Sequence, residues 1–186
     1  MKNIYLIGMM GSGKTTVGKL LAEKLSCQFF DTDQFIEQAT GRKVKDIIHK
    51  DGFGVFSVHE LEALSNAPLE DCIVSTGGKT YLDKRCRDFV DSTGKVIFLN
   101  VSLEEIEKRL TKEELERRMI DLRGQELMGA LAMIKKERYP TYKSGPSMEI
   151  NGDGGPEEIC ERIIREIKNE QNQTFLQRGI NFFDVQ

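Results

Sequence analysis

Residues 8–15 read Gly-Met-Met-Gly-Ser-Gly-Lys-Thr, and this stretch decides the fold class. Two glycines separated by four residues, then a lysine and a hydroxyl residue, form the pattern of a phosphate-binding loop. The stretch follows a short apolar run at 4–7 and precedes an amphipathic run at 15–25. It therefore lies between an expected strand and an expected helix, as the pattern requires. A glycine turn with an incidental lysine is the alternative, and this context disfavours it.

The physical role of each position in the loop can be assigned. Glycines at 8, 11 and 13 let the backbone curl so that successive N–H groups point at a phosphate, next to the positive end of a helix. Lysine then reaches the outer phosphates, and the hydroxyl group that follows it is offered to Mg²⁺. The predicted nucleotide-binding residues are Gly11, Ser12, Gly13, Lys14, Thr15 and Thr16. The loop predicts a nucleotide but no particular reaction, because GTPases, motor ATPases and small-molecule kinases share it.

Outward from the loop, short apolar runs alternate with amphipathic stretches, which is typical of an α/β fold with a parallel sheet flanked by helices. The apolar runs predict five strands, at 4–7, 28–30, 72–74, 96–100 and 148–150. The amphipathic runs predict helices at 15–25, 44–50, 55–64, 84–90, 103–110, 125–137 and 156–168. We expect a single domain over 1–168. The tail 169–186 is either a docking segment or an appendage that packs on its own domain or stays disordered.

The composition excludes several classes of function. The chain has 186 residues, with 27 Lys and Arg against 30 Asp and Glu, so its net charge of −3 gives no broad basic field for nucleic acid. Neither an apolar run of roughly 18 residues nor a secretory cleavage site is found, so we expect a cytoplasmic protein without a membrane partner. The four cysteines are widely spaced and predicted to be reduced thiols. His49 and His59 are expected on helix surfaces, although His59 falls in the candidate acceptor segment.

Asp31 and Asp33 come at the end of the second predicted strand. Alternate residues at a strand end point the same way, so both carboxylates are expected to reach the crevice at the phosphate loop. One of them can hold Mg²⁺ through water while the other accepts a proton from a substrate hydroxyl. The alternative is that the pair merely caps a helix. Switch GTPases would carry an Asn-Lys-x-Asp motif, which is absent.

With these features in order, the chain resembles the shikimate kinase family from about residue 2 to 168. The resemblance rests on the phosphate loop and on Asp31-Thr32-Asp33, Ile36-Glu37, Gly41-Arg42, Gly52, Phe56, Glu60, Ser75-Thr76-Gly77-Gly78, Arg138-Tyr139-Pro140-Thr141-Tyr142 and Asn151 to Glu158. It implies a phosphate-loop kinase fold with five parallel strands, a mobile lid and an acceptor segment at about 32–62. It also implies ATP-dependent phosphorylation of a ring hydroxyl of shikimate, a step of aromatic amino acid biosynthesis, by a monomer.

The resemblance also implies roles for individual residues. Lys14 matches the phosphate-binding position, and Thr15 and Asp31 match the positions near Mg²⁺. Asp33 matches the residue that holds the acceptor hydroxyl and is the candidate base. Gly77 and Gly78 match positions that let the substrate ring come close. Arg138 matches an arginine that pairs with the substrate carboxylate, whereas without the family it would pass for a solvated helix end.

The lid is expected at about 110–128. Arg118 aligns best with the family's lid arginine, and Arg117 is a possible substitute. A guanidinium there would offset charge on the transferring phosphate. The alternative is that both arginines face solvent, since the proline that accompanies them in the family is absent. Arg109 resembles a position near the adenine base.

Two departures fall in the acceptor site. Residues 52–57 read Gly-Phe-Gly-Val-Phe-Ser where the family has Gly-Glu-x-x-Phe-Arg, so Ser57 replaces an arginine. Lys79 replaces the third of three glycines. We hypothesise that Lys79 supplies the charge that Ser57 lacks, directly or through Glu60; the alternative is that Lys79 points to solvent.

These departures leave two rival functions. One is a kinase of the same fold for another small polyhydroxy or carboxylate acceptor. The other is an inactive nucleotide-binding homologue that docks through its apolar tail. The presence of Lys14, Thr15, Asp31 and Asp33 argues against the second rival, because an abandoned site has no physical need for them.

Overall fold

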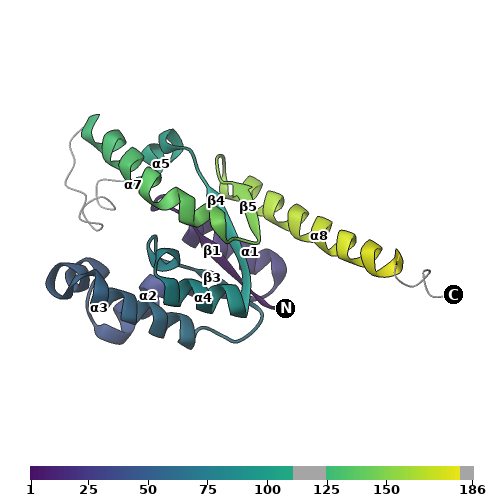
Figure 1. The fold of residues 1–186 in the computed structure, drawn as a ribbon, viewed down its shortest axis with the longest axis horizontal. Coiled ribbons are helices and arrows are strands. Elements are labelled where there is room, and N and C mark those ends of the chain that lie inside the picture. The colour runs from purple at the N-terminus through teal and green to yellow at the C-terminus, as the bar shows by residue number, and fades with distance from the viewer. Residues whose placement is uncertain (111–124, 181–186) are drawn as a thin grey trace.

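The computed structural model describes residues 1–110 and 125–180. Its centre is a five-stranded sheet in which every neighbouring pair is parallel, in the order β2-β3-β1-β4-β5 (Figure 1). The strands are β1 (Asn3–Ile7), β2 (Gln28–Asp31), β3 (Cys72–Ser75), β4 (Gly94–Asn100) and β5 (Met148–Asn151). All five strands predicted from the sequence are confirmed, with ends that differ by no more than two residues. Parallel strands present their carboxyl ends at one edge, where ligands of such sheets bind.

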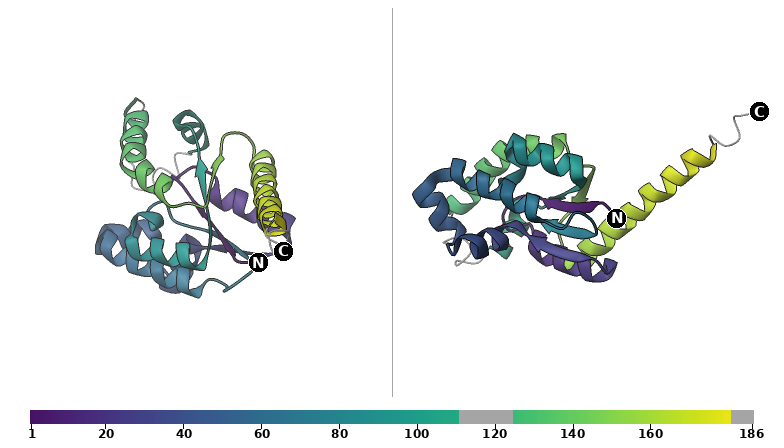
Figure 2. Two further views of the ribbon diagram at one scale, coloured as in Figure 1. Left: turned by 45° about the vertical axis from the view of Figure 1, so that its right-hand side comes forward. Right: turned by 90° about the horizontal axis from the view of Figure 1, so that it is seen from below.

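Helices cover both faces of the sheet. The described helices are α1 (Lys14–Leu25), α2 (Thr32–Thr40), α3 (Val44–Asn66), the 3₁₀ turn η1 (Thr80–Leu82), α4 (Lys84–Thr93), α5 (Leu103–Arg109), α7 (Gln125–Ser144) and α8 (Pro156–Ile180). Apolar side chains of α1 and α8 pack with one set of strand residues, and those of α3, α4, α5 and α7 pack with the alternate set (Figure 2). The predicted fold class, helices on both faces of a parallel sheet, is therefore confirmed.

The core follows the pleat of the central strand. Ile4 and Leu6 of β1 pack on α1 and α8, whereas Tyr5 and Ile7 pack on the opposite layer. All four side chains are at most 2% exposed. A third, smaller cluster joins α2 to α3 and includes Ile36 and Phe56. This cluster packs the two helices that carry part of the site against each other, and Leu64 of α3 joins the larger cluster on the sheet.

One helix was missed in the sequence. The strand β2 ends at Asp31, whose side chain accepts a hydrogen bond from the backbone N–H of Gln34 and caps α2. Asp33 therefore lies in the first turn of α2, so the prediction that both carboxylates extend from a strand end was wrong. The predicted helices 44–50 and 55–64 are both present within α3, which breaks at Gly52 (φ 81°, ψ 169°).

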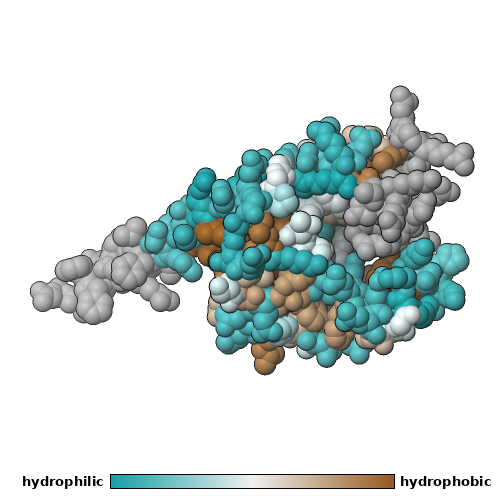
Figure 3. Space-filling model, turned by 180° about the vertical axis from the view of Figure 1, so that it is seen from behind, coloured by the Kyte–Doolittle hydropathy of each residue, from teal (hydrophilic) through white to brown (hydrophobic). Residues whose placement is uncertain are grey.

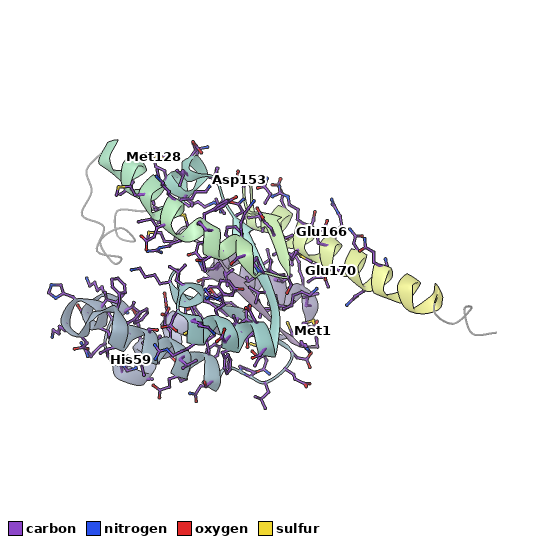
Figure 4. All side chains as sticks on the ribbon, in the orientation of Figure 1. Met1, His59, Met128, Asp153, Glu166 and Glu170 are labelled. Atoms are coloured by element: carbon purple, nitrogen blue, oxygen red, sulfur yellow. The ribbon has the colours of Figure 1, made fainter. Side chains whose placement is uncertain are left out.

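Three helices are longer than predicted: α4 by one turn, to Thr93, and α7 and α8 by more. Helix α7 continues through Pro140 to Ser144, and α8 continues from the expected end at residue 168 to Ile180. The last turns of α8 project away from the body of the protein (Figures 1 and 2). Lys95 of β4 forms a salt bridge with Glu170, which is labelled in Figure 4. Residues 169–180 thus prolong a helix instead of forming a separate segment.

The surface opposite the view of Figure 1 is largely hydrophilic, interrupted by small apolar patches (Figure 3). Within the described residues, none of the helices combines the length and the apolar character that crossing a membrane requires.

Candidate functional site

The phosphate loop lies between the end of β1 and the start of α1, as predicted. Gly13 caps α1 with φ 85°, a conformation that side chains rarely adopt. Gly8 has φ 147°, and a Cβ on it would lie 2.8 Å from the carbonyl oxygen of Leu99. The loop therefore requires glycine at both positions. The N–H groups of the first turn of α1 have no helical acceptors and can donate to an anion.

Lys14 is placed at the centre of this loop. Its side chain is buried at 7% exposure, and Nζ donates to the carbonyl oxygens of Gly8 at 2.9 Å and Met9 at 2.8 Å. It also lies 3.2 Å from Ser12 Oγ. Carbonyl groups of the phosphate loop thus hold the ammonium group of Lys14 next to the N-terminus of α1. This placement brings together the groups that the sequence assigned to phosphate binding.

A cluster of oxygen atoms lies beside the loop. Thr15 Oγ1 donates to Asp31 Oδ2 at 2.8 Å and is 3.3 Å from Ser75 Oγ. The parallel register pairs Asp31 of β2 with Ser75 of β3, which explains why their side chains meet. Hydroxyl and carboxylate oxygens are the ligands that Mg²⁺ prefers, and Mg²⁺ takes only one or two of them from a protein. The donor set therefore fits Mg²⁺, although no group of three metal-ligating side chains was found among the described residues.

Asp33 points from the first turn of α2 toward the loop after β3. A Cβ on Gly77 would lie 3.1 Å from Asp33 Oδ1 and 2.7 Å from Glu60 Oε1. The backbone N–H of Gly77 donates to Thr32 Oγ1 at 3.2 Å, which fixes this loop against α2. Two carboxylates thus converge on a residue without a side chain. Only glycine fits at this position, because the oxygens of Asp33, Glu60 and Thr80 surround the place where a Cβ would stand.

Arg138 reaches the same loop from α7. Its side chain is 6% exposed, and Nη1 donates to the carbonyl oxygen of Gly78 at 3.2 Å. Tyr142 donates its hydroxyl to the same carbonyl. The Nε atom of Arg138 is buried and makes no hydrogen bond. A buried donor without a partner is costly, so this atom marks a place where an acceptor group of a ligand would be stabilised.

Glu60 is a buried carboxyl group within the site. It is 2% exposed and accepts a hydrogen bond of 2.6 Å from Thr80 Oγ1. Burial, opposed by the hydrogen bond from Thr80 and supported by the neighbouring charge of Asp33, raises the pKa of Glu60 to about 7. Glu60 therefore gains or loses a proton near neutral pH.

Replacing Glu60 with Gln tests this prediction through stability. Unfolded Glu60 ionises near its ordinary pKa of 4.5, so the folded wild type loses stability as the pH rises through 7. We expect the difference in free energy of unfolding, E60Q minus wild type, to grow by about 2–3 kcal/mol between pH 5 and pH 8. Urea denaturation at both pH values measures it. The control E107Q, on an exposed residue of α5, should show no such trend, and a pH-independent difference for E60Q would refute the prediction.

Lys79 lies next to this carboxylate cluster. Its side chain is half-buried, and Nζ lies 3.4 Å from the centroid of the Phe53 ring. Burial, and then the charge of Arg138, lower the pKa of Lys79. The alternative that Lys79 points freely into solvent is therefore wrong. The hydroxyl group of Ser57 makes other contacts: it donates to Asp83 and accepts from Arg85 at 3.1 Å.

Arg109 links the phosphate loop to the segment that follows β5. It donates to Ser12 O at 3.4 Å, to Gly152 O at 2.9 Å and to Gly154 O at 2.8 Å, and it pairs with Glu105. It thus joins the phosphate loop to the segment between β5 and α8. Arg117 and Arg118, the predicted lid residues, lie outside the described residues.

Four further residues of the site had no role predicted from the sequence: Ser75, Thr80, Phe53 and Tyr142. A hydroxyl residue at the end of the buried strand β3 was a usable signal for Ser75. Thr16, a predicted nucleotide-binding residue, is exposed on α1. His59 lies on α3, 3.7 Å from Glu62, rather than among the acceptor groups (Figure 4). The four cysteines are free thiols.

A phosphate loop on a parallel sheet, with carboxylates and an arginine gathered at the same edge, defines a phosphate-loop kinase of small molecules. The family model described as shikimate kinase matches residues 10–168. The chain belongs to the shikimate kinase family, whose members are ATP-dependent phosphotransferases acting on a hydroxyl group of shikimate. The matched residues include the phosphate loop from Met10 onward and the whole acceptor segment.

Individual relatives agree with the family match. A shikimate kinase of Sulfurihydrogenibium sp. is 38% identical over 172 residues, which cover 90% of this chain and 99% of the relative. Shikimate kinase from Acinetobacter baumannii, solved in complex with shikimate, is 29% identical with a TM-score of 0.84, over 91% of this chain and 94% of that one. Deoxyadenosine kinase from M. mycoides, at 16% identity and a TM-score of 0.58 over 89% of this chain and 99% of that one, shares the fold.

Proposed function

We propose that this member of the family transfers the γ-phosphoryl group of ATP to shikimate with the residues described above. One observation carries the proposal. A Cβ on Gly78 would lie 3.5 Å from Arg138 Nη1 and 3.6 Å from the backbone nitrogen of Met10 in the phosphate loop. A carboxylate-binding arginine and the phosphate loop therefore meet at one glycine, so an acceptor held by Arg138 lies within reach of the transferred group.

The donor side consists of the phosphate loop and α1. The backbone N–H groups of Gly11, Ser12 and Gly13 and the ammonium of Lys14 hold the phosphates, and Thr16 lies at the outer rim. Arg109 holds the loop beside the segment after β5, where the base would bind. Arg118 of the lid, or Arg117, would cover the transferring group. Such contacts act by positioning and by offsetting charge, because the protein forms no covalent bond in this reaction.

Thr15 and Asp31 would hold Mg²⁺, with Ser75 orienting the Thr15 hydroxyl. When bound, Mg²⁺ offsets the charge that develops on the phosphate oxygens. In the described structure Thr15 forms hydrogen bonds with Asp31 and Ser75, which keeps the oxygen donors aligned at the edge of the sheet.

The acceptor side is the loop after β3 together with α2 and α7. Arg138 binds the carboxylate of shikimate, since a planar fork of donors suits two carboxylate oxygens. Asp33 accepts the proton of the attacked hydroxyl and orients its oxygen. Gly78 leaves room for the ring, Gly77 lets Asp33 and Glu60 come close to the backbone, and Lys79 lies at the edge of the acceptor side.

The chain is expected to act as a monomeric cytoplasmic enzyme with no nucleic-acid partner, in one domain over 1–168 that includes the lid at about 110–128. Its net charge of −3 supports the absence of nucleic-acid binding. A kinase for another small carboxylated acceptor is the second candidate, favoured by the presence of Phe53, Ser57 and Lys79 in the acceptor segment.

ADP release measured with Mg-ATP, with and without millimolar shikimate, tests the proposed function. We expect release to depend on shikimate. If ATP binds but shikimate does not stimulate release, the acceptor assignment is wrong, and a screen of polyhydroxy and carboxylated acceptors identifies the second candidate. Nucleotide binding without turnover of any acceptor would indicate an inactive homologue.

A further inference from the structure

Two cationic side chains lie at the loop after β3 on the acceptor side. Arg138 Nη1 donates to the carbonyl oxygen of Gly78, the residue before Lys79. Burial, and then the charge of Arg138, lower the pKa of Lys79. Among the described residues, no carboxylate lies within salt-bridge distance of either Lys79 or Arg138. Like charges held together in a half-buried pocket repel each other, and an anion between them removes that repulsion.

The neighbouring acidic residue compensates this charge only in part. Glu60 is the carboxyl group that raises the pKa of Lys79 from within the pocket, and Glu137 does so from α7. Glu60 is buried and has a pKa of about 7, so it is partly protonated at neutral pH. Its hydrogen bond is made with Thr80, not with Lys79. The positive charge of Lys79 and Arg138 thus remains available to a ligand.

The position of Lys79 is set by an aromatic ring. Nζ lies 3.4 Å from the centroid of Phe53, which is within the range of a strong cation–π contact. Phe53 is itself 51% exposed, so it has no core to fill and its described contact with Lys79 is at the rim of the pocket. A ring face attracts an ammonium without neutralising it. Phe53 therefore restricts where Lys79 can go while its charge remains available.

Arg85 is the other cation near the position of Ser57, and the structure excludes it from this role. Its guanidinium donates to both carboxylate oxygens of Asp83, at 3.2 and 2.9 Å, and to Ser57 Oγ at 3.1 Å. Hydrogen bonds from Arg85 hold the pKa of Asp83 well below its ordinary value. The charge of Arg85 is thus offset by Asp83, whereas Lys79, like Arg138, forms no salt bridge among the described residues.

We propose that Lys79 is a specificity-determining residue, which binds the acceptor carboxylate together with Arg138, and that Phe53 is the residue that positions it. The phenylalanine and the lysine both stand where the family pattern has other residues, and they contact each other. A point charge replaces a second planar fork, so recognition is looser than with two arginines. This proposal rests on the proposed function, because it assigns the acceptor site of that reaction.

Substitution of Lys79 with Met tests the charge while keeping an unbranched stem. With shikimate and Mg-ATP, we expect K79M to raise the KM and the calorimetric Kd for shikimate about 10- to 100-fold. The Kd for Mg-ATP and kcat should change by less than about threefold, because Lys79 does not contact the donor site. The matched control is K136M, which removes an exposed lysine two residues before Arg138 and should leave all four constants unchanged.

Two further measurements separate direct binding from a structural effect. Against the methyl ester of shikimate, whose carboxylate is neutralised, wild type and K79M should bind equally weakly. F53L keeps an apolar side chain but removes the ring face, so we expect a rise in KM of about 3- to 10-fold. The double variant should be no weaker than K79M alone, because Phe53 acts through Lys79.

The outcomes distinguish the two levels of the proposal. If the wild type shows no shikimate-dependent ADP release, the proposed function is wrong and this assignment falls with it. If the wild type is active and K79M keeps its Kd for shikimate, or loses affinity equally for the methyl ester, only the role of Lys79 is overturned. Additive effects of F53L and K79M would overturn the positioning role of Phe53.

Discussion

Replacing Asp33 with Asn is expected to lower kcat for shikimate by about 10²- to 10⁴-fold, the range that removal of a general base produces. The amide keeps the shape of the carboxylate but accepts no proton at neutral pH. Asp33 is placed for this role by the first turn of α2, where its Oδ1 lies close to the backbone of Gly77, 3.1 Å from where a Cβ would stand. We expect the attacked hydroxyl to approach the carboxylate of Asp33 from the side that faces away from Gly77.

The effect of Asp33→Asn should fall on the chemical step alone. We expect the Kd values for shikimate and Mg-ATP to stay within about threefold of the wild type, measured by calorimetry, because an amide still accepts a hydrogen bond. The matched control is D46N, which changes an exposed aspartate in the first turn of α3. A kcat within tenfold of the wild type would show that Asp33 only orients the hydroxyl. In that case phosphoryl transfer from this site needs no base, as a loose transition state permits.

The parts of the fold that depend on local sequence could be predicted from it. Strands buried on both faces read as short apolar runs, so β1 and β4 were evident from the sequence alone. The phosphate loop was also evident, because its glycines and lysine follow one another along the chain. Helix α2 was not evident from the sequence. Its N-cap residue, Asp31, is also the last residue of β2, and an aspartate is compatible with both positions, so the sequence did not indicate where a helix begins. The capping alternative considered for the aspartates was the correct local structure.

The parts of the site that depend on packing could not be predicted. The pKa of Glu60 follows from its burial against residues that are 20 or more positions away, such as Thr80. The contact between Phe53 and Lys79 joins α3 to the loop after β3, and no periodicity of either segment indicates it. In the sequence, Arg138 looks like part of a solvated helix end, because Lys135, Lys136 and Glu137 precede it. In the structure, its side chain is buried. Only the family resemblance identified its role beforehand.

Replacing Lys14 with Met is expected to lower kcat by about 10²- to 10³-fold, the usual effect of removing one donor that stabilises developing charge. Methionine keeps an unbranched stem of similar length and removes the charge. The Kd for Mg-ATP should also rise about tenfold or more through the loss of charge-assisted hydrogen bonds. ADP release and calorimetry with Mg-ATP measure the two effects separately. The control is K19M, which removes an exposed lysine of the same helix α1.

Lys14→Arg separates the charge from the geometry of the loop. Lys14 Nζ lies within 2.9 Å of the carbonyl oxygens of Gly8 and Met9, in a space that leaves the side chain 7% exposed. A planar guanidinium cannot occupy the position of a compact ammonium there, so K14R should lose nearly as much activity as K14M. Full activity of K14R would show that any nearby positive charge is sufficient. The loop geometry, in which the ammonium binds the backbone that curls around the phosphate, predicts instead that only lysine supports full turnover.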